Sequence, residues 1–316
     1  MIDKSLVIKS KAKKIVGVIF HFVLVFGICF VILYPLIIKI TTAFKGPDDL
    51  LDKTIIYLPR QFTVSTIINV FVGMDYPKAF MNTLLLSLLV SGLAVIACTL
   101  VGYGFGRFKF PGKKFWFLMV IITMIVPPQT IFLPTFLHFK NFDLFGILSL
   151  FGMENGISLI NNMGSFAVIG ATAMGFKNGL YIFLIQQFFR NLPKELEEAA
   201  YVDGAGHFKT FYMTLLPSAT SIISTVFLFS FIWQWMDLYY TQFFIGRVNV
   251  LSNALLNVGY QITSMGSGTN LSAASPVALS QINNIASLLV IIPLLILYAF
   301  TQKTFVESME RSGLVG

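Results

Sequence analysis

Long stretches without a single charged residue constrain this chain more than any other feature. The first covers residues 15–38, between Lys14 and Lys39, and others cover 80–106 and 115–139. A helix needs about 20 mostly apolar residues to cross the hydrocarbon core of a bilayer. In that core every backbone hydrogen bond must be made inside the protein, which favours helices. These stretches therefore predict membrane-spanning helices.

Three further stretches bring the expected number of spans to six. They cover residues 165–189, 214–236 and 285–301. The uncharged residues before 285 are too rich in Ser, Asn and Gly to form a span of their own. The predicted fold is all-α, a polytopic membrane protein with six transmembrane helices. An even number of spans places both termini on the same side of the membrane.

Some of these stretches contain residues that disturb a helix. Lys177 interrupts 165–189, and a charge in lipid is costly unless it pairs, reaches the interface or faces a water-filled cavity. Pro217 falls in the first turn of 214–236, where proline is best tolerated. Three prolines must bend or break the helix in the outer half of 115–139. They are Pro127, Pro128 and Pro134.

The composition agrees with a chain that is dissolved in lipid. Only 11% of the residues are charged and 56% are hydrophobic, whereas soluble domains carry about 25% charged residues. Rich aromatic content and low charge also exclude a disordered chain. Cys29 and Cys98 both lie inside apolar stretches and suggest no disulfide or metal site. The three histidines are scattered in the sequence, so we expect no metal site and no cofactor bound by this chain.

The distribution of Lys and Arg predicts the orientation. With residues 1–14 placed inside, 14 basic residues lie on the inner side and 7 on the outer side. The positive-inside rule then makes both termini cytoplasmic. The net charge of +8 is explained by orientation, so no nucleic-acid partner is expected. The first apolar stretch is too long for a signal peptide. The expected organisation is a basic N-terminus (1–14), a transmembrane domain (15–303) that includes a cytoplasmic loop (190–213), and a cytoplasmic tail (304–316).

The cytoplasmic loop 190–213 predicts a short helix over 193–203. Pro193 suits a first helical turn, and Gly204 suits a left-handed stop. Acidic residues near the start of the helix stabilise the positive end of its dipole. They are Glu195, Glu197 and Glu198.

One side of this helix is small and apolar, because Leu196, Ala199 and Ala200 follow helical spacing. Two interpretations remain open from the residues alone. The helix is a docking surface that lets another protein approach closely, or it is an interfacial linker between two spans. Acidic residues at its start argue against an anionic lipid surface as the partner.

The loop also resembles a known motif. The sequence Glu198-Ala199-Ala200, with Gly204 four residues on and Leu216-Pro217 after it, looks like the EAA loop of binding-protein-dependent ABC importer permeases. The extension Asp203-Gly204-Ala205 is similar to the carbohydrate branch of that family, typified by the six-span permease of the maltose importer. Segments 82–84, 107–112, 187–190 and 302–316 look similar too, so the resemblance covers nearly the whole chain.

The resemblance implies a fold, partners and a mechanism. It implies the type I ABC importer permease architecture in a prokaryotic inner or plasma membrane. It also implies a second homologous permease subunit, two cytoplasmic ATPase subunits and an extracytoplasmic solute-binding protein. ATP and magnesium would bind to the ATPase, because the only approach to a phosphate loop here, Gly112-Lys113-Lys114, lacks the upstream glycine and the Ser or Thr. The residues implied to couple the chain to the ATPase are Glu198, Ala199, Ala200, Asp203, Gly204, Leu216 and Pro217.

A second polar cluster lies at the end of the fifth stretch. Trp233, Gln234, Trp235 and Asp237 combine aromatic rings with hydrogen-bonding groups. An interfacial belt of Trp and Tyr explains the rings without any ligand, but the polar pair Gln234 and Asp237 is not required by such a belt. Sugars bind by stacking on rings and by hydrogen bonds. These four residues and Lys177 are therefore candidates for the substrate pathway.

Other functions remain as alternatives. The chain could be an ABC permease for an amino acid, a peptide or another non-sugar solute, and only the extension after Asp203 favours carbohydrate. A non-transporting membrane scaffold is opposed only by the loop motif. A membrane enzyme is disfavoured, because no catalytic motif such as H-E-x-x-H is present.

Overall fold

The computed structural model describes residues 4–143, 146–152, 156–175, 177–264 and 275–311. Every regular element in these ranges is helical, and the only β-type pairings there are two isolated bridges. The helices are α1 Lys4–Ala43, α2 Pro47–Leu51, α3 Ser65–Gly73, α4 Tyr76–Arg107, α5 Lys113–Ile125, α6 Pro128–Lys140, α7 Ile147–Leu150, α8 Gly164–Ala171, α9 Asn178–Asn191, α10 Glu195–Val202, α11 His207–Thr210, the π-helical turn η1 Phe211–Leu215, α12 Leu216–Ser218, α13 Thr220–Trp235, α14 Tyr239–Ile245, α15 Leu251–Ser264 and α16 Pro276–Arg311.

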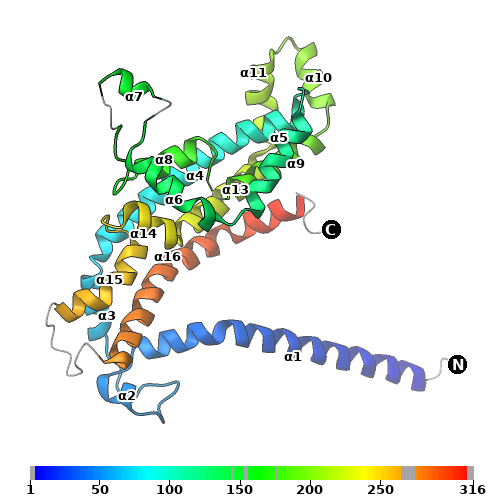
Figure 1. The fold of residues 1–316 in the computed structure, drawn as a ribbon. Coiled ribbons are helices and arrows are strands. Elements are labelled where there is room, and N and C mark those ends of the chain that lie inside the picture. The colour runs from blue at the N-terminus through cyan, green and yellow to red at the C-terminus, as the bar shows by residue number, and fades with distance from the viewer. Residues whose placement is uncertain (1–3, 144–145, 153–155, 176, 265–274, 312–316) are drawn as a thin grey trace. The chain divides into compact units, whose positions relative to one another are not determined.

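The chain forms two compact units, and each is described by itself. Unit 1 contains residues 1–73 and 258–289, and unit 2 contains residues 74–257 and 290–316. In unit 2, α4 is the central helix and packs against α8, α9 and α13 (Figure 1). Unit 2 contains the loop 190–213 and the polar cluster identified from the sequence.

Glycines bring α4 and α9 close together at one end of unit 2. A Cβ atom added to Gly102 would lie 2.7 Å from Cγ2 of Ile185, and one added to Gly106 would lie 2.8 Å from Cβ of Phe189. Gly104, between them, faces open space. Small residues allow helices to approach closely in a membrane.

The polar residues of α4 are used in helix packing. Thr83, Ser87, Ser91 and Thr99 are all buried. The Thr83 hydroxyl donates to the Ala79 carbonyl in the same helix, and it accepts a hydrogen bond from the backbone N–H of Leu251 (2.8 Å). The four buried residues are separated by multiples of four positions. This spacing predicts one packed face of the helix, and the structure confirms it.

The third apolar stretch is sharply bent, as its prolines predict. Helices α5 and α6 meet at an angle of 99°. Val126 and Pro127 are both in extended conformations at the break, because a residue before proline is disfavoured in the helical region. Beyond the bend, Phe132 of α6 packs against aromatic residues of α14, with its ring 4.3 Å from that of Phe243.

The fourth apolar stretch is not one helix, which corrects the expected span over 165–189. Helix α8 ends at Ala171 and α9 begins at Asn178. Ala173 has a φ of 55°, a left-handed conformation that ends a helix. Neither α8 nor α9 is long enough to cross a membrane alone.

The fifth apolar stretch also differs from the expected helix, which was to begin at about residue 214 with Pro217 in its first turn. The segment that ends in α12 meets α13 at an angle of 72°. Pro217 lies in α12, and α13 begins only at Thr220. Proline removes a backbone donor and clashes with the preceding turn, so the membrane helix begins after it.

Three single helices of the described part are long and apolar enough to span a membrane. They are residues 14–43 of α1, all of α4 and residues 276–303 of α16, which contain the first, second and sixth expected spans. Counting the two bent pairs as spans raises the number to five. The broken stretch α8–α9 is the remaining expected span.

Four charged residues of unit 1 are bound within the unit. Lys45, although buried, donates to two backbone carbonyls at 2.7 and 3.0 Å. The carboxylate of Asp49 accepts a hydrogen bond from the backbone N–H of Arg60 (2.7 Å), and Arg60 forms a salt bridge with Asp52 (2.9 Å). A hydrogen bond from the Thr54 hydroxyl lowers the pKa of Asp52.

Candidate functional site

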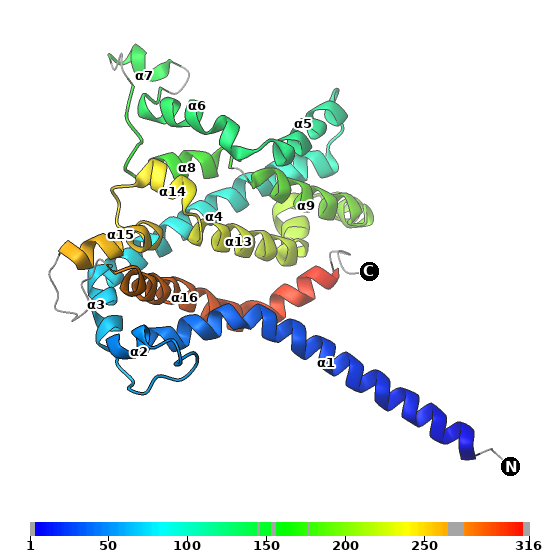
Figure 2. The ribbon, with the colours of Figure 1, turned by 60° about the horizontal axis from the view of Figure 1, so that its bottom comes forward.

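The loop 190–213 contains the short helix that the sequence predicts. Helix α10 covers Glu195–Val202, inside the expected range of 193–203. Gly204 follows with a φ of 80°, and the backbone N–H of Ala205 donates to the carbonyl of Ala200 (2.9 Å). This is the left-handed stop expected of Gly204. Helices α10 and α11 project from unit 2 beyond the ends of α5 and α9 (Figure 1), and Figure 2 shows α4 between α8 and α13 of the same unit.

Arg107, the last residue of α4, anchors this loop. Its Nε lies 2.9 Å from Oε1 of Glu197, and the two side chains are only 6% and 17% exposed. Its Nη2 donates to the carbonyl of Leu192 (2.8 Å) and to that of Pro193 (3.4 Å). A buried, charge-assisted pair of this kind fixes geometry more firmly than a surface pair. Helix α10 is therefore held directly to the end of α4.

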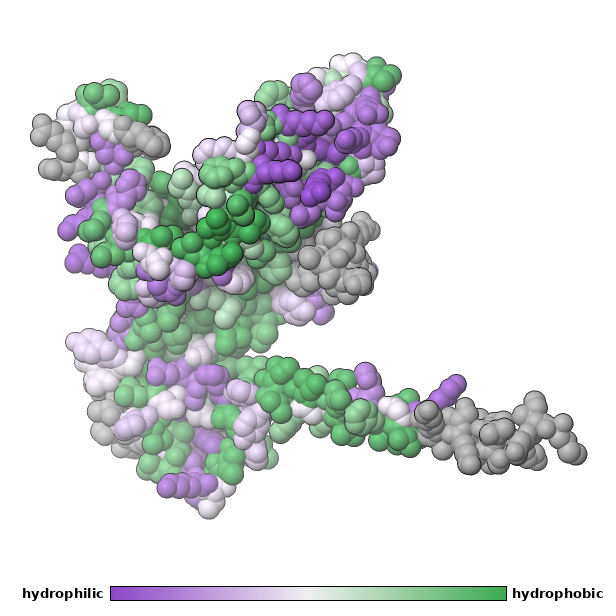
Figure 3. Space-filling view, turned by 45° about the vertical axis from the view of Figure 1, so that its right-hand side comes forward, coloured by the Kyte–Doolittle hydropathy of each residue, from purple (hydrophilic) through white to green (hydrophobic). Residues whose placement is uncertain are grey.

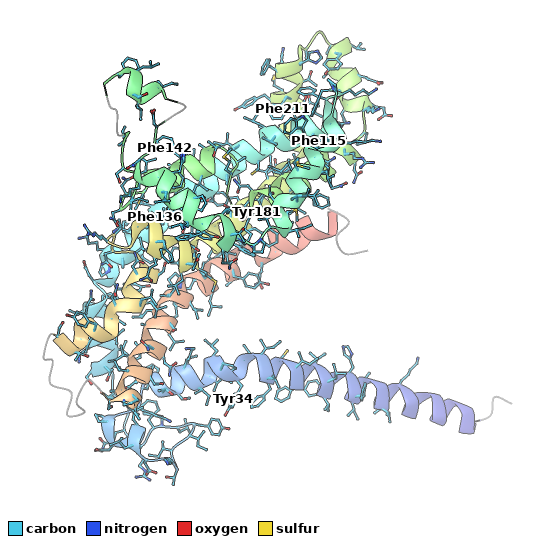
Figure 4. The ribbon with its side chains drawn as sticks, viewed as in Figure 1. Tyr34, Phe115, Phe136, Phe142, Tyr181 and Phe211 are labelled. Atoms are coloured by element: carbon cyan, nitrogen blue, oxygen red, sulfur yellow. The ribbon has the colours of Figure 1, made fainter. Side chains whose placement is uncertain are left out.

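An aromatic cluster holds the other side of the loop. The buried ring of Tyr103 in α4 lies 4.4 Å from that of Phe211 and 5.3 Å from that of Phe189. Phe211 begins the π-helical turn after α11 and is labelled in Figure 4. Aromatic pairs at such distances add stability beyond the area that they bury. Both ends of the loop are thus packed against α4.

The opposite face of the loop is free and partly apolar. Glu198, Ala199, Asp203 and Gly204 are exposed, and Ala200 is half-buried. Large apolar side chains near them are exposed too, since Val202 is 87% and Phe208 is 92% exposed. In Figure 3 hydrophilic residues gather around this end of unit 2, and hydrophobic residues cover its middle.

Leu216 and Pro217 do not lie on the exposed face of the loop. They form part of α12 and line an apolar groove of about 730 Å³ beside Ile96 and Leu100 of α4. The structure therefore does not bring them to the exposed face that carries Glu198 and Ala199. They lie just before the bend that leads into α13, which indicates that they shape the turn between the loop and this helix.

The second candidate region is a small cavity in unit 2. It has a volume of about 110 Å³ and lies where the break between α8 and α9 meets the end of α13. Four of the five residues that the sequence suggests for the substrate pathway line it. The lining residues are Val90, Phe166, Ile169, Lys177, Asn178, Tyr181, Ser230, Trp233, Gln234, Asp237 and Tyr240.

Lys177 is the cation of this cavity. Its Nζ lies 3.8 Å from the centre of the Trp233 ring, a cation–π contact. In the part of the chain that the structure describes, no carboxylate oxygen lies within 4.0 Å of this ammonium. The sequence allows Lys177 to face a cavity, and the structure places it in the lining of one.

Asp237 is bound to the beginning of α14. Its Oδ2 accepts hydrogen bonds from the backbone N–H (2.7 Å) and the hydroxyl (2.8 Å) of Thr241. Its Oδ1 accepts a longer one from the backbone N–H of Tyr240 (3.4 Å). The carboxylate thus satisfies donors of the first turn of α14.

Trp235 is not part of the cavity. Its side chain is 2% exposed, and its Nε1 donates to the carbonyl of Val290 (3.1 Å). Its ring also packs edge-on against that of Phe80. Alternate residues of a helix point in different directions, so Trp233 and Trp235 cannot line the same cavity.

Sequence reasoning missed several polar residues of the cavity. Asn178 and Tyr181 are buried in α9, and the Tyr181 hydroxyl (Figure 4) is hydrogen-bonded to Ser230. Ser230 could have been found, because it precedes Trp233, Gln234 and Asp237 by three, four and seven residues and thus shares their helix face. Asn178 and Tyr181 carry no such signal, since their position depends on the break before α9.

The described residues contain no group of three or more His, Cys, Asp or Glu side chains that could hold a metal ion. The chemistry that the two regions offer is hydrogen bonding, ion pairing and ring stacking.

Long apolar helices, some of them sharply bent, define a class: a multi-pass membrane protein. The chain belongs to the family of binding-protein-dependent transport system inner membrane components, whose model matches residues 98–307. This match includes α10 and the cavity-lining parts of α8, α9 and α13.

Proteins similar to this chain in sequence are also named as transport permeases. The osmoprotective compounds uptake permease protein GgtD of Synechocystis is 27% identical over 73% of this chain and 68% of its own length. The arabinooligosaccharides transport system permease protein AraQ of Halalkalibacterium halodurans is 23% identical over 92% of this chain and 93% of its own length.

The fold matches a solved structure. A chain in the crystal structure of a bacterial ABC transporter involved in the import of the acidic polysaccharide alginate superposes with a TM-score of 0.70. The match covers 93% of this chain and 98% of the other, at 18% sequence identity. The likeness shows the ABC permease fold.

Proposed function

We propose that this chain is a permease subunit of an ATP-driven importer that takes up a carbohydrate. In this proposal an extracytoplasmic solute-binding protein delivers the solute, a second permease completes the pathway, and two cytoplasmic ATPase subunits drive the cycle. The loop after α9 would transmit the ATPase movement to the membrane helices.

The geometry of α10 is the observation that carries the proposal. Its inner side is fixed to α4 by Arg107 and Glu197, and its outer side presents Glu198, Ala199 and Val202 to solvent. Exposed apolar residues next to charge suit a protein interface. A helix that is fixed on one side and free on the other suits a rigid contact between an ATPase and the membrane helices.

The carbohydrate part of the proposal is supported by the names of similar proteins. AraQ is named for arabinooligosaccharides, and the structural neighbour belongs to an importer of alginate. GgtD is named for osmoprotective compounds, which makes a small osmoprotective solute the second candidate.

The proposed topology has six spans with both termini in the cytoplasm. The broken segment α8–α9 would be the fourth span, with its two helices together crossing the bilayer. This rests on the family, on the loop and on the excess of Lys and Arg on one side. Reporter enzymes fused after residues 12 and 316 should both report the cytoplasm, and one fused within α7 should report the outside.

Reconstitution tests the proposed function. The chain, with the permease, ATPase and solute-binding protein encoded beside it, is placed in liposomes, and uptake of labelled sugars is measured with and without ATP. We expect uptake that requires ATP and the binding protein. Uptake of a labelled osmoprotective solute in place of every sugar would favour the second candidate, and ATP-independent uptake or none would reject both.

A further inference from the structure

Two buried amide nitrogens of the cavity have no hydrogen-bond partner among the residues that the structure describes. Asn178 is 4% exposed, and in the described part of the chain its Nδ2 has no hydrogen-bond acceptor. The Nε2 of Gln234 is likewise buried without an acceptor there. Most buried donors in folded proteins are paired, and an unpaired one costs about 1–3 kcal/mol. Both groups line the same cavity, so the cavity offers two unused donors.

Lys177 adds a positive charge to these donors. Its ammonium rests on the Trp233 ring, and no described carboxylate lies within ion-pair distance of it. Lys177 is half-buried, and a charge that is partly removed from water is stabilised by a counter-charge. The unpaired donors and the ammonium together form a site that can donate hydrogen bonds to an acceptor group of a ligand.

Asp237 does not supply the missing counter-charge. It lines the same cavity, but its two oxygens accept three hydrogen bonds from the first turn of α14. Those donors compensate its charge locally. The longest of these bonds is 3.4 Å, so its Oδ1 has room for a further donor such as a sugar hydroxyl.

The size of the cavity limits what it can hold. Sites that enclose a whole drug-sized ligand have volumes of about 300–1,000 Å³, whereas this cavity has about 110 Å³. It therefore suits one functional group of a larger solute, with the exposed part of the Trp233 ring at its edge. The side chain of Trp233 is 49% exposed, which leaves area for a sugar ring to stack on.

We propose that this cavity binds the carboxylate of an acidic sugar residue, so that the carbohydrate imported through this chain is anionic. This rests on the proposed import of a carbohydrate. The carboxylate accepts hydrogen bonds from Lys177, Asn178 and Gln234, and the sugar ring stacks on Trp233. A neutral sugar would leave the ammonium without a counter-charge.

The test compares each acidic sugar with its own neutral form. The reconstituted transporter is given labelled oligouronides, each paired with the same oligosaccharide after reduction of its carboxyl groups to alcohols. For each pair we measure the ratio of the initial ATP-driven uptake rates of acidic and neutral members. We expect the wild-type ratio to exceed one, and Lys177→Gln to lower it about tenfold, chiefly through KM. Lys177→Arg should largely preserve it, because it keeps the charge.

Controls separate this role from a structural one. Lys140→Gln removes an exposed Lys at the end of α6 and should leave the ratio unchanged. The amount of assembled complex in the membrane is measured for every variant. A wild-type preference for the neutral members, or an equal loss of both members in Lys177→Gln, would overturn the acidic-sugar site while leaving carbohydrate import intact. ATP-driven uptake of no sugar at all would instead reject the proposed function.

Discussion

The loop 190–213 and the cavity are both polar regions of unit 2, and they differ in how their polar groups are paired. In the loop, Glu197 forms a salt bridge with Arg107 of α4. The beginning and the end of the loop also contact α4, through Arg107 and Tyr103. In the cavity, the donors of Lys177, Asn178 and Gln234 have no acceptor in the described chain. The anchor of the loop is thus paired within the chain, whereas the donors of the cavity are unpaired within the described residues.

Helix α9 connects the two regions. Its first residue, Asn178, lines the cavity, and its last, Asn191, directly precedes the loop that Arg107 anchors. A helix of 14 residues is about 21 Å long. Close packing on α4 through Gly102 and Gly106 makes this connection rigid. A displacement of α10 would therefore reach the cavity through one packed helix.

The largest effect on ATP-driven uptake is expected from changing the exposed face of α10 or the left-handed glycine that follows the helix. Ala199→Trp places a large ring where close contact is needed, and Gly204→Val forces a β-branched residue into a φ of 80°, at a cost of about 1–2 kcal/mol. Both should lower ATP-driven uptake at least about tenfold, and Gly204→Asp should act in the same direction. Uptake is measured in proteoliposomes at equal amounts of complex.

Gly206→Val is the matched control for the glycine variant. Gly206 has a φ of −74° and no atom within 4 Å of an added Cβ, so any residue fits its backbone. Its uptake should stay close to that of the wild type. Equal losses at both glycines would show that the left-handed stop is not what matters.

The next largest effect is expected from breaking the anchor of the loop. Arg107→Ala leaves Glu197 buried without its partner, which costs about 3 kcal/mol. We expect a lower thermal midpoint of the purified complex and weaker co-purification of the ATPase. The double variant Arg107→Ala, Glu197→Ala should recover part of the stability, because no unpaired charge remains.

Glu195→Ala serves as the control for the anchor, since Glu195 is an exposed acid of the same helix. Its thermal midpoint should be unchanged. If the double variant is as unstable as the sum of both single variants, the salt bridge does not couple the two residues.

A smaller effect is expected where α4 and α9 touch. Gly102→Ala adds a Cβ 2.7 Å from Ile185 and should destabilise the protein by about 1–3 kcal/mol. Gly104→Ala meets no atom within 4 Å and should stabilise it by about 0.5–1 kcal/mol, because alanine favours a helix. Thermal unfolding in detergent measures both. The same sign for both variants would contradict the close approach of the two helices.

The smallest effect is expected at the hydrogen bond between the Tyr201 hydroxyl and Nδ1 of His207, which is 2.9 Å long and exposed. Tyr201→Phe removes it and should cost about 1 kcal/mol at most, with uptake almost unchanged. A large loss of uptake in Tyr201→Phe would show that this bond, rather than the Arg107 anchor, fixes the loop.

The sequence predicted the loop well because its signals are local. Acidic residues and glycine at fixed spacing predict α10 and its stop, and the structure confirms both. Pro193 was expected in the first turn but lies before it, because α10 begins at Glu195. Arg107 was not predicted as the anchor of α10, because it lies 90 residues from Glu197 and only the packing of α4 brings the two together.

The cavity was only partly predictable. Trp233, Gln234 and Asp237 follow helical spacing and do line it, whereas Trp235 points away. The expected fourth span over 165–189 was wrong as a single helix, because apolar composition does not reveal a left-handed residue such as Ala173. That break places Lys177 and Asn178 in the cavity, so periodicity alone could not have found the whole site.

Photo-cross-linking from α10 tests the central claim most directly. A photoreactive amino acid replaces Ala199 on the free face of α10, or Leu150, which is 84% exposed on α7, and the assembled transporter is irradiated. The account predicts a covalent product with the ATPase from position 199, none from position 150, and a yield that changes when ATP is added. Equal yields from both positions, or no product from position 199 in a fully assembled complex, would contradict it.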